Sequence, residues 1–347
     1  MFEFINGDTL NELDNIDINC IDSIITDSLC NIELCGNVDV WKKCLKVLKP
    51  GGHLLVFGGS KTFHRIACAI EDAGFEIRDT IMWIYGSSLY KTDETIKPFF
   101  EPIIIARKPI EESIISNIIK YNVGGINIDE CRISAKQGEY DIRHYTKEDC
   151  FQNLKPKESK FQVKPQPSGR FPANVILTYN ESDKDEVCSG FPEGGRNGSI
   201  TKQYDINNKV YGDYGKCNTW EAYNDSGSAA RYFYCARTSY RDVENVDIKP
   251  TNLIQYLIRL ITPKEGTILD PFMGKGSVGR AVAYENNDNN TSYKFIGIEQ
   301  DEEKCNIAKE KTKYAISDKN KLEINKLDVI NNREDKSHSL FDYLKEV

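Results

Sequence analysis

Short runs of apolar residues alternate with segments of helical spacing through the first hundred residues of the chain. Continuous apolar runs bounded by polar or Gly/Pro turns predict buried strands. The strands are expected at Ile24–Asp27, His53–Gly58, Phe75–Tyr85 and Pro102–Ala106, and the helices at Trp41–Lys49 and Lys61–Ala73. The breakers Pro50-Gly51-Gly52 and Gly74 are expected to end the two helices. Strands that alternate with helices predict a parallel, doubly wound α/β sheet.

The apolar pattern fades after residue 109 and returns at Lys249. Residues 110–248 are rich in Gly, Asn, Tyr, Lys and Ser and have no regular periodicity. After Pro250, apolar residues at helical spacing predict another helix. The charged end of the chain is expected to be a surface helix with loops or a disordered tail. We therefore expect a first half-domain (1–109), an insertion (110–248), a second half-domain (249–314) and a tail (315–347).

A Gly-rich turn in the second half-domain carries the clearest chemical signal. Thr267–Asp270 is predicted to be a strand, and a helix is predicted from about Ser277. The glycines between and just after them form G-x-G-x-x-G in the strand–turn–helix context that this pattern needs. A second strand, Lys294–Glu299, ends on an acid. Its separation along the sequence from the glycine turn is that expected of a carboxylate that binds the ribose of the cofactor. Together these features predict an adenosine-containing cofactor.

The composition is that of an ordinary soluble protein, with one local exception in charge. The formal net charge of -8 argues against a nucleic-acid binder that works through overall charge. Between Arg132 and Arg170, however, nine Lys/Arg face five Asp/Glu, and five aromatic residues are interleaved with them up to Phe171. Basic residues mixed with aromatics suit a nucleic-acid surface, through phosphate contacts and stacking. A solvated insertion whose lysines have no special role explains the same pattern.

Cysteine usage and the amino terminus indicate an intracellular protein. The 11 cysteines contain no Cys-x-x-Cys pair, which is typical of reduced thiols rather than of disulfides or a zinc site. The first residues, MFEFINGD, lack a signal-peptide pattern, and no apolar run approaches membrane-spanning length. We expect neither a membrane partner nor a bound metal.

Two segments, DPFMGKGSVG and FIGIEQDEEKCNIAKEK, resemble the cofactor-binding motifs of a known enzyme family. With KPGGHLLVFGG, EPIIIARKP, GRFPANVIL and KPTNLIQYLIRLITP, they are similar to the S-adenosylmethionine-dependent DNA amino-methyltransferases, especially their phage and prophage members. These are the N6-adenine and N4-cytosine enzymes, here with the catalytic half before the cofactor half. The resemblance extends from Asn6 to Lys313. It implies a Rossmann-like methyltransferase sheet with an irregular DNA-recognition insertion, S-adenosylmethionine as cofactor, double-stranded DNA as partner, and the cytoplasm of a bacterium or phage-infected cell.

The resemblance also implies roles for individual residues. The residues implied to contact the cofactor are Asp8, Lys249, Asp270, Pro271, Phe272, Gly274, Gly276 and Glu299. Glu299 would bind the ribose hydroxyls, Asp8 would face the adenine ring, and Lys249 would lie near the methionine end. Plainer alternatives stay open. Asp270 and Glu299 are also suited to cap the following helices, Asp8 to form a turn, and Lys249 to be a surface lysine.

The catalytic motif departs from the family pattern. Members carry Asp/Asn/Ser-Pro-Pro-Tyr/Phe/Trp after the strand that is Ile24–Asp27 here, and this chain has Asp27-Ser28-Leu29-Cys30. By the resemblance, Asp27 and the carbonyl of Ser28 accept the two amino hydrogens of the target base and localise the nitrogen lone pair. Cys30 replaces the aromatic residue that stacks on the flipped base, which weakens base holding by about 1–3 kcal/mol. Asp in the first position favours adenine N6 over cytosine N4.

Two other functions stay open beside a DNA methyltransferase. The altered motif suits a relative that binds DNA and cofactor without transferring a methyl group. The G-x-G-x-x-G pattern alone would also suit an NAD(P)-dependent oxidoreductase, although Asp270-Pro271-Phe272 ahead of it argues against one. Cys30 as a nucleophile is the weakest idea, because cysteine-using cytosine methyltransferases have a differently ordered chain. The sequence does not decide the target site, a homodimer or a cognate restriction enzyme.

Overall fold

The computed structural model describes residues 1–27, 35–85, 99–133, 169–179, 191, 193–196, 225–237, 240–242 and 249–331. The chain divides into two compact units. The first unit contains Met1–Ile81, Glu101–Asn127 and Arg237–Val347, and the second contains Met82–Phe100 and Ile128–Ala236. Among the described residues, no helix is long and apolar enough to cross a membrane.

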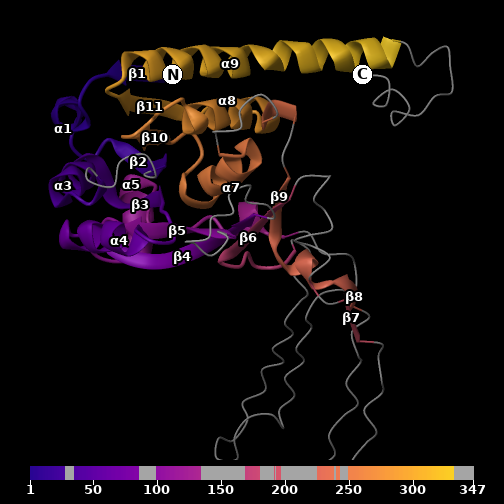
Figure 1. Ribbon diagram of the computed structural model, residues 1–347, viewed down its shortest axis with the longest axis horizontal. Helices are drawn as coiled ribbons and strands as arrows, with labels where there is room; N and C mark the ends of the chain where they lie inside the picture. Colours follow the sequence, from indigo (N-terminus) through magenta and orange to yellow (C-terminus); the bar gives the residue numbers. More distant parts are fainter. Residues whose placement is uncertain are drawn as a thin grey trace, which may run out of the picture. The chain divides into compact units, whose positions relative to one another are not determined.

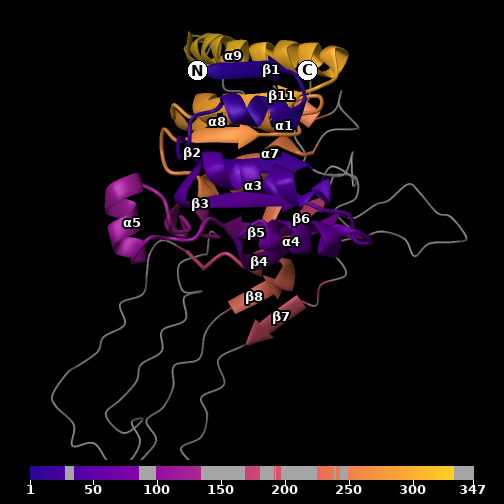
Figure 2. The ribbon, with the colours of Figure 1, turned by 90° about the vertical axis from the view of Figure 1, so that its left-hand side faces the viewer.

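The first unit is built on one sheet, whose strands follow the order β1-β11-β10-β2-β3-β5-β4 (Figure 2). Their bounds are β1 Phe2–Asn6, β2 Ile21–Asp27, β3 Leu48–Phe57, β4 Glu76–Tyr85, β5 Phe100–Arg107, β10 Thr267–Asp270 and β11 Lys294–Glu299. The strands from β1 to β3 in this order are all parallel. The α/β class and the doubly wound sheet are therefore confirmed, and β10 and β11 have the predicted bounds.

One strand contradicts the expectation of a wholly parallel sheet. β5 runs antiparallel to β3, with His53 opposite Arg107 and Phe57 opposite Ile103. Parallel neighbours need a long crossover, usually a helix, whereas antiparallel strands do not. The sequence has no helical pattern between Tyr85 and Phe100, and β5 lies between β3 and β4 in the sheet. The prediction placed the strand correctly but gave it the wrong direction.

Helices cover both faces of this sheet (Figure 1). On one face lie α1 (Thr9–Glu12), α3 (Val38–Val47) and α4 (Phe63–Asp72), and on the other α7 (Thr251–Ile261) and α8 (Ser277–Asn289). α9 (Glu302–Asn331) packs on α8, and α5 (Ile114–Tyr121) packs near β3. Short 3₁₀ turns occur at Leu13–Asn15, Asp129–Cys131, Ala229–Tyr232 and Tyr240–Asp242. α9 thus continues past residue 314 into the segment expected as a tail, as the surface-helix alternative for that segment allowed.

The boundary between α3 and β3 also differs from the prediction. α3 ends at Val47, and β3 begins at Leu48, so that Pro50-Gly51-Gly52 lies inside the strand. Gly51 has a φ of 80°, which a side chain would strain. The register of β2 against β3 shifts at the same level, between Ile21 and Ser23. Pro-Gly-Gly therefore forms an irregular start to the strand rather than a turn ahead of it.

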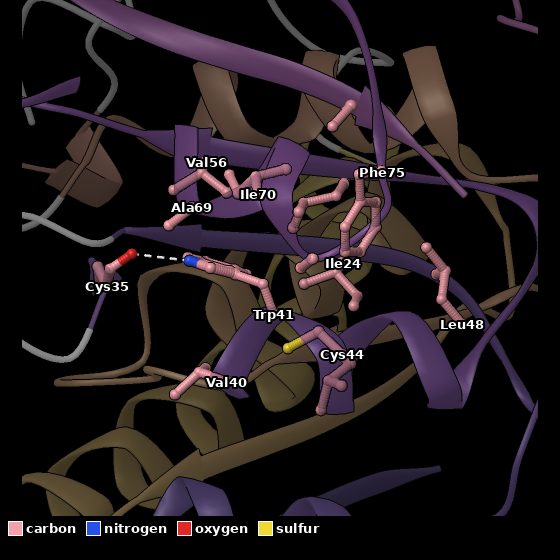
Figure 3. Close-up of a cluster of buried hydrophobic side chains, with 14 of the residues drawn as sticks. Ile24, Cys35, Val40, Trp41, Cys44, Leu48, Val56, Ala69, Ile70 and Phe75 are labelled. Atoms are coloured by element: carbon pink, nitrogen blue, oxygen red, sulfur yellow. Dashed lines mark hydrogen bonds between the residues drawn. The ribbon is translucent and has the colours of Figure 1, made fainter. Parts of the chain in front are cut away.

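One buried core lies between the sheet and the helices α3 and α4. Trp41 of α3 is fully buried there among Ile24, Val56 and Ile70 (Figure 3). Its indole Nε1 donates to the carbonyl oxygen of Cys35 at 2.7 Å. A buried indole needs such a partner, because its N–H would otherwise lose its hydrogen bond to water. This core holds α3 and α4 against the sheet.

The second unit holds the remaining strands. β6 (Val175–Tyr179) pairs in parallel with the end of β4, where Met82 lies opposite Val175. The indole of Trp83 donates to the hydroxyl of Thr178 at 2.8 Å. β9 (Tyr234–Arg237) follows β6 in the strand order, and β7 (Glu193–Arg196) and β8 (Asp225–Ser228) form a separate antiparallel pair.

Replacing Trp41 by Ala should destabilise the protein by about 3–5 kcal/mol, because the change leaves a cavity and removes the hydrogen bond to Cys35. Urea unfolding followed by circular dichroism measures this free energy. The matched control is Lys42→Ala, at the next and exposed position of α3, which should change it by less than about 1 kcal/mol. A loss below about 1 kcal/mol for Trp41→Ala would contradict the role given to this core.

Candidate active site

Two aspartates meet where the sheet changes its winding direction. β2 and β10 pair in parallel, with Ile24 opposite Leu269, so that Asp27 and Asp270 stand at neighbouring carboxyl ends. From this pair the chain continues to β3 on one side and to β11 on the other. Ligands of open α/β sheets bind in the crevice at such a switch point. Pairing of the two strands therefore places both acids at the expected ligand site.

Asp270 is held in a buried and polar setting. Its Oδ1 accepts hydrogen bonds from the hydroxyl of Thr26 at 2.6 Å and from the backbone N–H of Phe272 at 3.2 Å. The pKa of Asp270 is raised to about 7, chiefly by burial; the two hydrogen bonds oppose the rise, and the nearby Asp27 and Glu299 add to it. The carboxyl group is therefore partly protonated near neutral pH.

The three glycines that follow Asp270 have different surroundings, and each position favours glycine for its own reason. Gly276 is the N-cap of α8 with a φ of 83°, and an added Cβ would lie 2.7 Å from the Cβ of Ala308 in α9. Gly279 packs in the same way on the ring of Phe295. Gly274 has a φ of 54°, but a Cβ there would meet none of the described residues within 4 Å. Gly274 thus borders open space at the carboxyl end of β10, where a ligand can approach the backbone.

The carboxylate of Glu299 is oriented by two backbone groups. The N–H of Gly274 donates to Oε2 at 2.9 Å, and the N–H of Asp301 donates to Oε1 at 3.0 Å. Each carboxylate oxygen has a second lone pair, which can accept a hydrogen bond from a ligand hydroxyl. The predicted capping alternative also describes these contacts, since Asp301 immediately precedes α9.

Asp8, Pro271 and Phe272 complete the wall around the strand ends. Asp8 caps α1 by accepting from the N–H of Asn11 at 3.2 Å, as the turn-residue alternative expected. The carbonyl of Pro271 accepts a hydrogen bond from the hydroxyl of Thr9 at 2.8 Å. The ring of Phe272 packs edge-on against Trp41, with the ring centres 6.0 Å apart. These contacts fix the backbone on both sides of the crevice.

Lys249 is not a surface lysine. Its side chain is only 10% exposed, and its Nζ lies 2.6 and 2.8 Å from the two carboxylate oxygens of Glu101 at the start of β5. The same Nζ lies 3.6 Å from Oδ2 of Asp27 and 5.2 Å from the centre of the Phe57 ring. Sequence reasoning missed both Glu101 and Phe57. The segment EPIIIARKP contained the only signal for Glu101, and nothing there indicated its partner.

Comparison with known proteins decides the family. The family model of the N6/N4 methyltransferases, described as DNA methylase, matches residues 34–310. The chain belongs to this DNA methylase family. The resemblance noted in the sequence is thereby confirmed.

Individual relatives of this chain are more distant. The type II methyltransferase M.HindIII of Haemophilus influenzae is 26% identical over 116 residues, and the match spans 26% of this chain but only 38% of that protein. The crystal structure of M1.HpyAVI has 15% identity and a TM-score of 0.45 over 90% of this chain and 98% of its own. The cytosine-N4-specific PvuII DNA methyltransferase has 12% identity and a TM-score of 0.46 over 92% and 94%. The assignment rests on the family model alone.

Two residues of the predicted site, Ser28 and Cys30, lie outside the described residues. The same holds for most of the basic segment of the insertion. In the second unit, the Arg132 guanidinium lies 4.5 Å from the centre of the Phe171 ring, and that of Arg170 lies 4.7 Å from the centre of the Tyr232 ring. Arg132, Arg170 and Phe171 belong to the predicted basic and aromatic segment, whereas Tyr232 lies outside it.

The free energy of unfolding of Asp270→Asn, relative to the wild type, should be higher at pH 8 than at pH 5. The raised pKa means that the folded protein keeps a proton that the unfolded chain loses above about pH 4. The wild type therefore loses stability as the pH rises toward 7, whereas the amide of the variant cannot titrate. We expect the stability difference between the two proteins to change in favour of the variant by about 2 kcal/mol from pH 5 to pH 8. Urea unfolding at both pH values measures it, and a difference that stays constant would show that Asp270 is already ionised at pH 5 in the folded protein.

Proposed function

We propose that this chain is a DNA amino-methyltransferase that uses S-adenosylmethionine to methylate an exocyclic amino nitrogen, adenine N6. The observation that carries the proposal is the meeting of Asp27 and Asp270 at the switch point of a sheet from the DNA methylase family. Asp27 is the first residue of the segment that aligns with the family's catalytic motif, and Asp270 is the first residue of the segment that resembles its cofactor-binding turn. One acid therefore serves the target base and the other borders the cofactor.

The described residues fit this cofactor. The space beside Gly274 allows close approach to the backbone, and the fixed carboxylate of Glu299 has lone pairs for the ribose hydroxyls. Phe272 supplies an apolar wall next to them. When bound, the cofactor supplies an electrophilic methyl group on a sulfonium.

Asp27 carries the central step in this proposal. An exocyclic amine is a poor nucleophile because its lone pair is delocalised into the ring of the base. A carboxylate that accepts an amino hydrogen localises that lone pair and aligns the nitrogen for attack. The proton released from the nitrogen passes to Asp27 or to water. An aspartate in this position supports adenine N6 rather than cytosine N4.

A second candidate is a relative that binds DNA and cofactor but has lost activity. The replacement of the family's Pro-Pro-aromatic by Ser28-Leu29-Cys30 is the observation that favours it. The loss of turn rigidity and of stacking weakens the placement of the base. The oxidoreductase alternative has lost its support, since the glycine turn belongs to a methylase family.

Asp27→Asn should lower methyl transfer by about a hundredfold or more, because an amide is a weaker acceptor than a carboxylate. The measurement is nucleoside mass spectrometry on unmethylated DNA of mixed sequence, incubated with S-adenosylmethionine. Asp39→Asn, on the exposed side of α3, is the control and should keep full activity. Absence of any methylated base with the wild type, despite bound cofactor, would favour the inactive relative.

Glu299→Ala should weaken binding of S-adenosylmethionine by about tenfold to a hundredfold. Hydrogen bonds to a charged group contribute roughly 1.5–3 kcal/mol, and the change also frees the backbone of Gly274. Isothermal titration calorimetry measures the Kd. Glu302→Ala, at the exposed start of α9, is the matched control and should leave it unchanged. Equal affinities for all three proteins would place the ribose elsewhere.

A further inference from the structure

Glu101 and Lys249 form a buried ion pair that joins two distant parts of the chain. Glu101 is 7% exposed at the start of β5, and Lys249 directly precedes Pro250 at the start of α7. The ammonium reaches both carboxylate oxygens, at 2.6 and 2.8 Å. A buried ammonium is stable only when it is paired and hydrogen-bonded, so Glu101 determines where this charge lies.

The ammonium lies between two carboxylates but is hydrogen-bonded to only one of them. Its distance to Oδ2 of Asp27, 3.6 Å, is an ion-pair distance but too long for a hydrogen bond. The ring of Phe57 faces the same ammonium at 5.2 Å and limits its movement. Lys249 therefore places a positive charge beside Asp27 but donates no hydrogen bond to its Oδ2.

We infer that Glu101 is a positioning residue, which holds the ammonium of Lys249 beside the carboxylate of Asp27 but not in direct contact with it. The inference rests on the proposed function, in which Asp27 accepts a hydrogen from the target amine. A lysine in direct contact would occupy a carboxylate oxygen that the amine needs. A lysine farther away would leave Asp27 next to Glu101 with no cation between them.

Removal of the Glu101 charge changes the surroundings of Asp27. Among the described residues, Lys249, Glu101 and Asp270 interact electrostatically with Asp27. Burial raises the pKa of the Glu101 carboxyl, and Lys249 opposes this rise. With Gln at position 101, the ammonium of Lys249 loses its ionic partner and can move into direct contact with Asp27. An ammonium in direct contact occupies an oxygen of Asp27 and weakens it as an acceptor for the target amine.

The experiment compares wild type, Glu101→Gln, Glu101→Asp and Glu285→Gln. Glu285 is the matched control, because it is also buried in an ion pair, with Arg259 at 2.7 Å between α7 and α8. Single-turnover methyl transfer to DNA gives the rate at saturating S-adenosylmethionine, and calorimetry gives the Kd of the cofactor. Crystal structures of the four proteins give the distance from Nζ of Lys249 to the carboxylate of Asp27 independently of turnover.

Glu101→Gln should lower the single-turnover rate by about tenfold or more, leave the cofactor Kd within about threefold, and bring Nζ of Lys249 within hydrogen-bonding distance of Asp27. Glu101→Asp should recover part of the rate, since it keeps the charge with a shorter reach. Glu285→Gln should change none of the three. A wild type that transfers no methyl group, with Lys249 still moving onto Asp27 in Glu101→Gln, would refute the proposed function and leave the positioning role intact. A Lys249–Asp27 distance that does not shorten in Glu101→Gln, or a rate loss that Glu285→Gln reproduces, would overturn the inference.

Discussion

The parallel pairing of β2 with β10 is the constraint on which the site depends. It places Asp27 and Asp270 at adjoining strand ends, and the hydroxyl of Thr26 joins one strand to the carboxyl group of the other at 2.6 Å. Carboxylates gathered in this way repel one another when buried. Two effects relieve that repulsion. Asp270 holds a proton more strongly than an ordinary aspartate, and Lys249 brings a positive charge next to Asp27 and Glu101.

The rest of the first unit keeps this edge in place. Trp41 anchors α3 against the sheet and also contacts Phe272, so the core and the cofactor turn share a side chain. Gly276 lets α8 start close against α9, and Glu299 ties the open turn at Gly274 to the end of β11. The site is thus built on packed elements, and the backbone beside Gly274 borders the open space that a ligand can enter.

The local elements of the site could be predicted from the sequence, whereas strand direction and contacts between distant residues could not. β10, α8 and β11 begin where predicted, because a strand, a Gly turn and a helix each have a strong local signal. The direction of β5 was missed, since an apolar run defines a strand but not its neighbours. The pair Lys249–Glu101 spans 148 positions along the chain, and no local pattern reports such a contact. The roles of Ser28 and Cys30 stay predictions.

The central claim is that the ends of β2, β10 and β11 form one site for cofactor and target amine. The most direct measurement is a crystal structure of the protein bound to S-adenosylhomocysteine. The account predicts ribose hydroxyls within hydrogen-bonding distance of Glu299, the adenosine beside Gly274, and the sulfur facing the carboxylate of Asp27. A ligand bound away from these strand ends, or one whose sulfur faces away from Asp27, would contradict it.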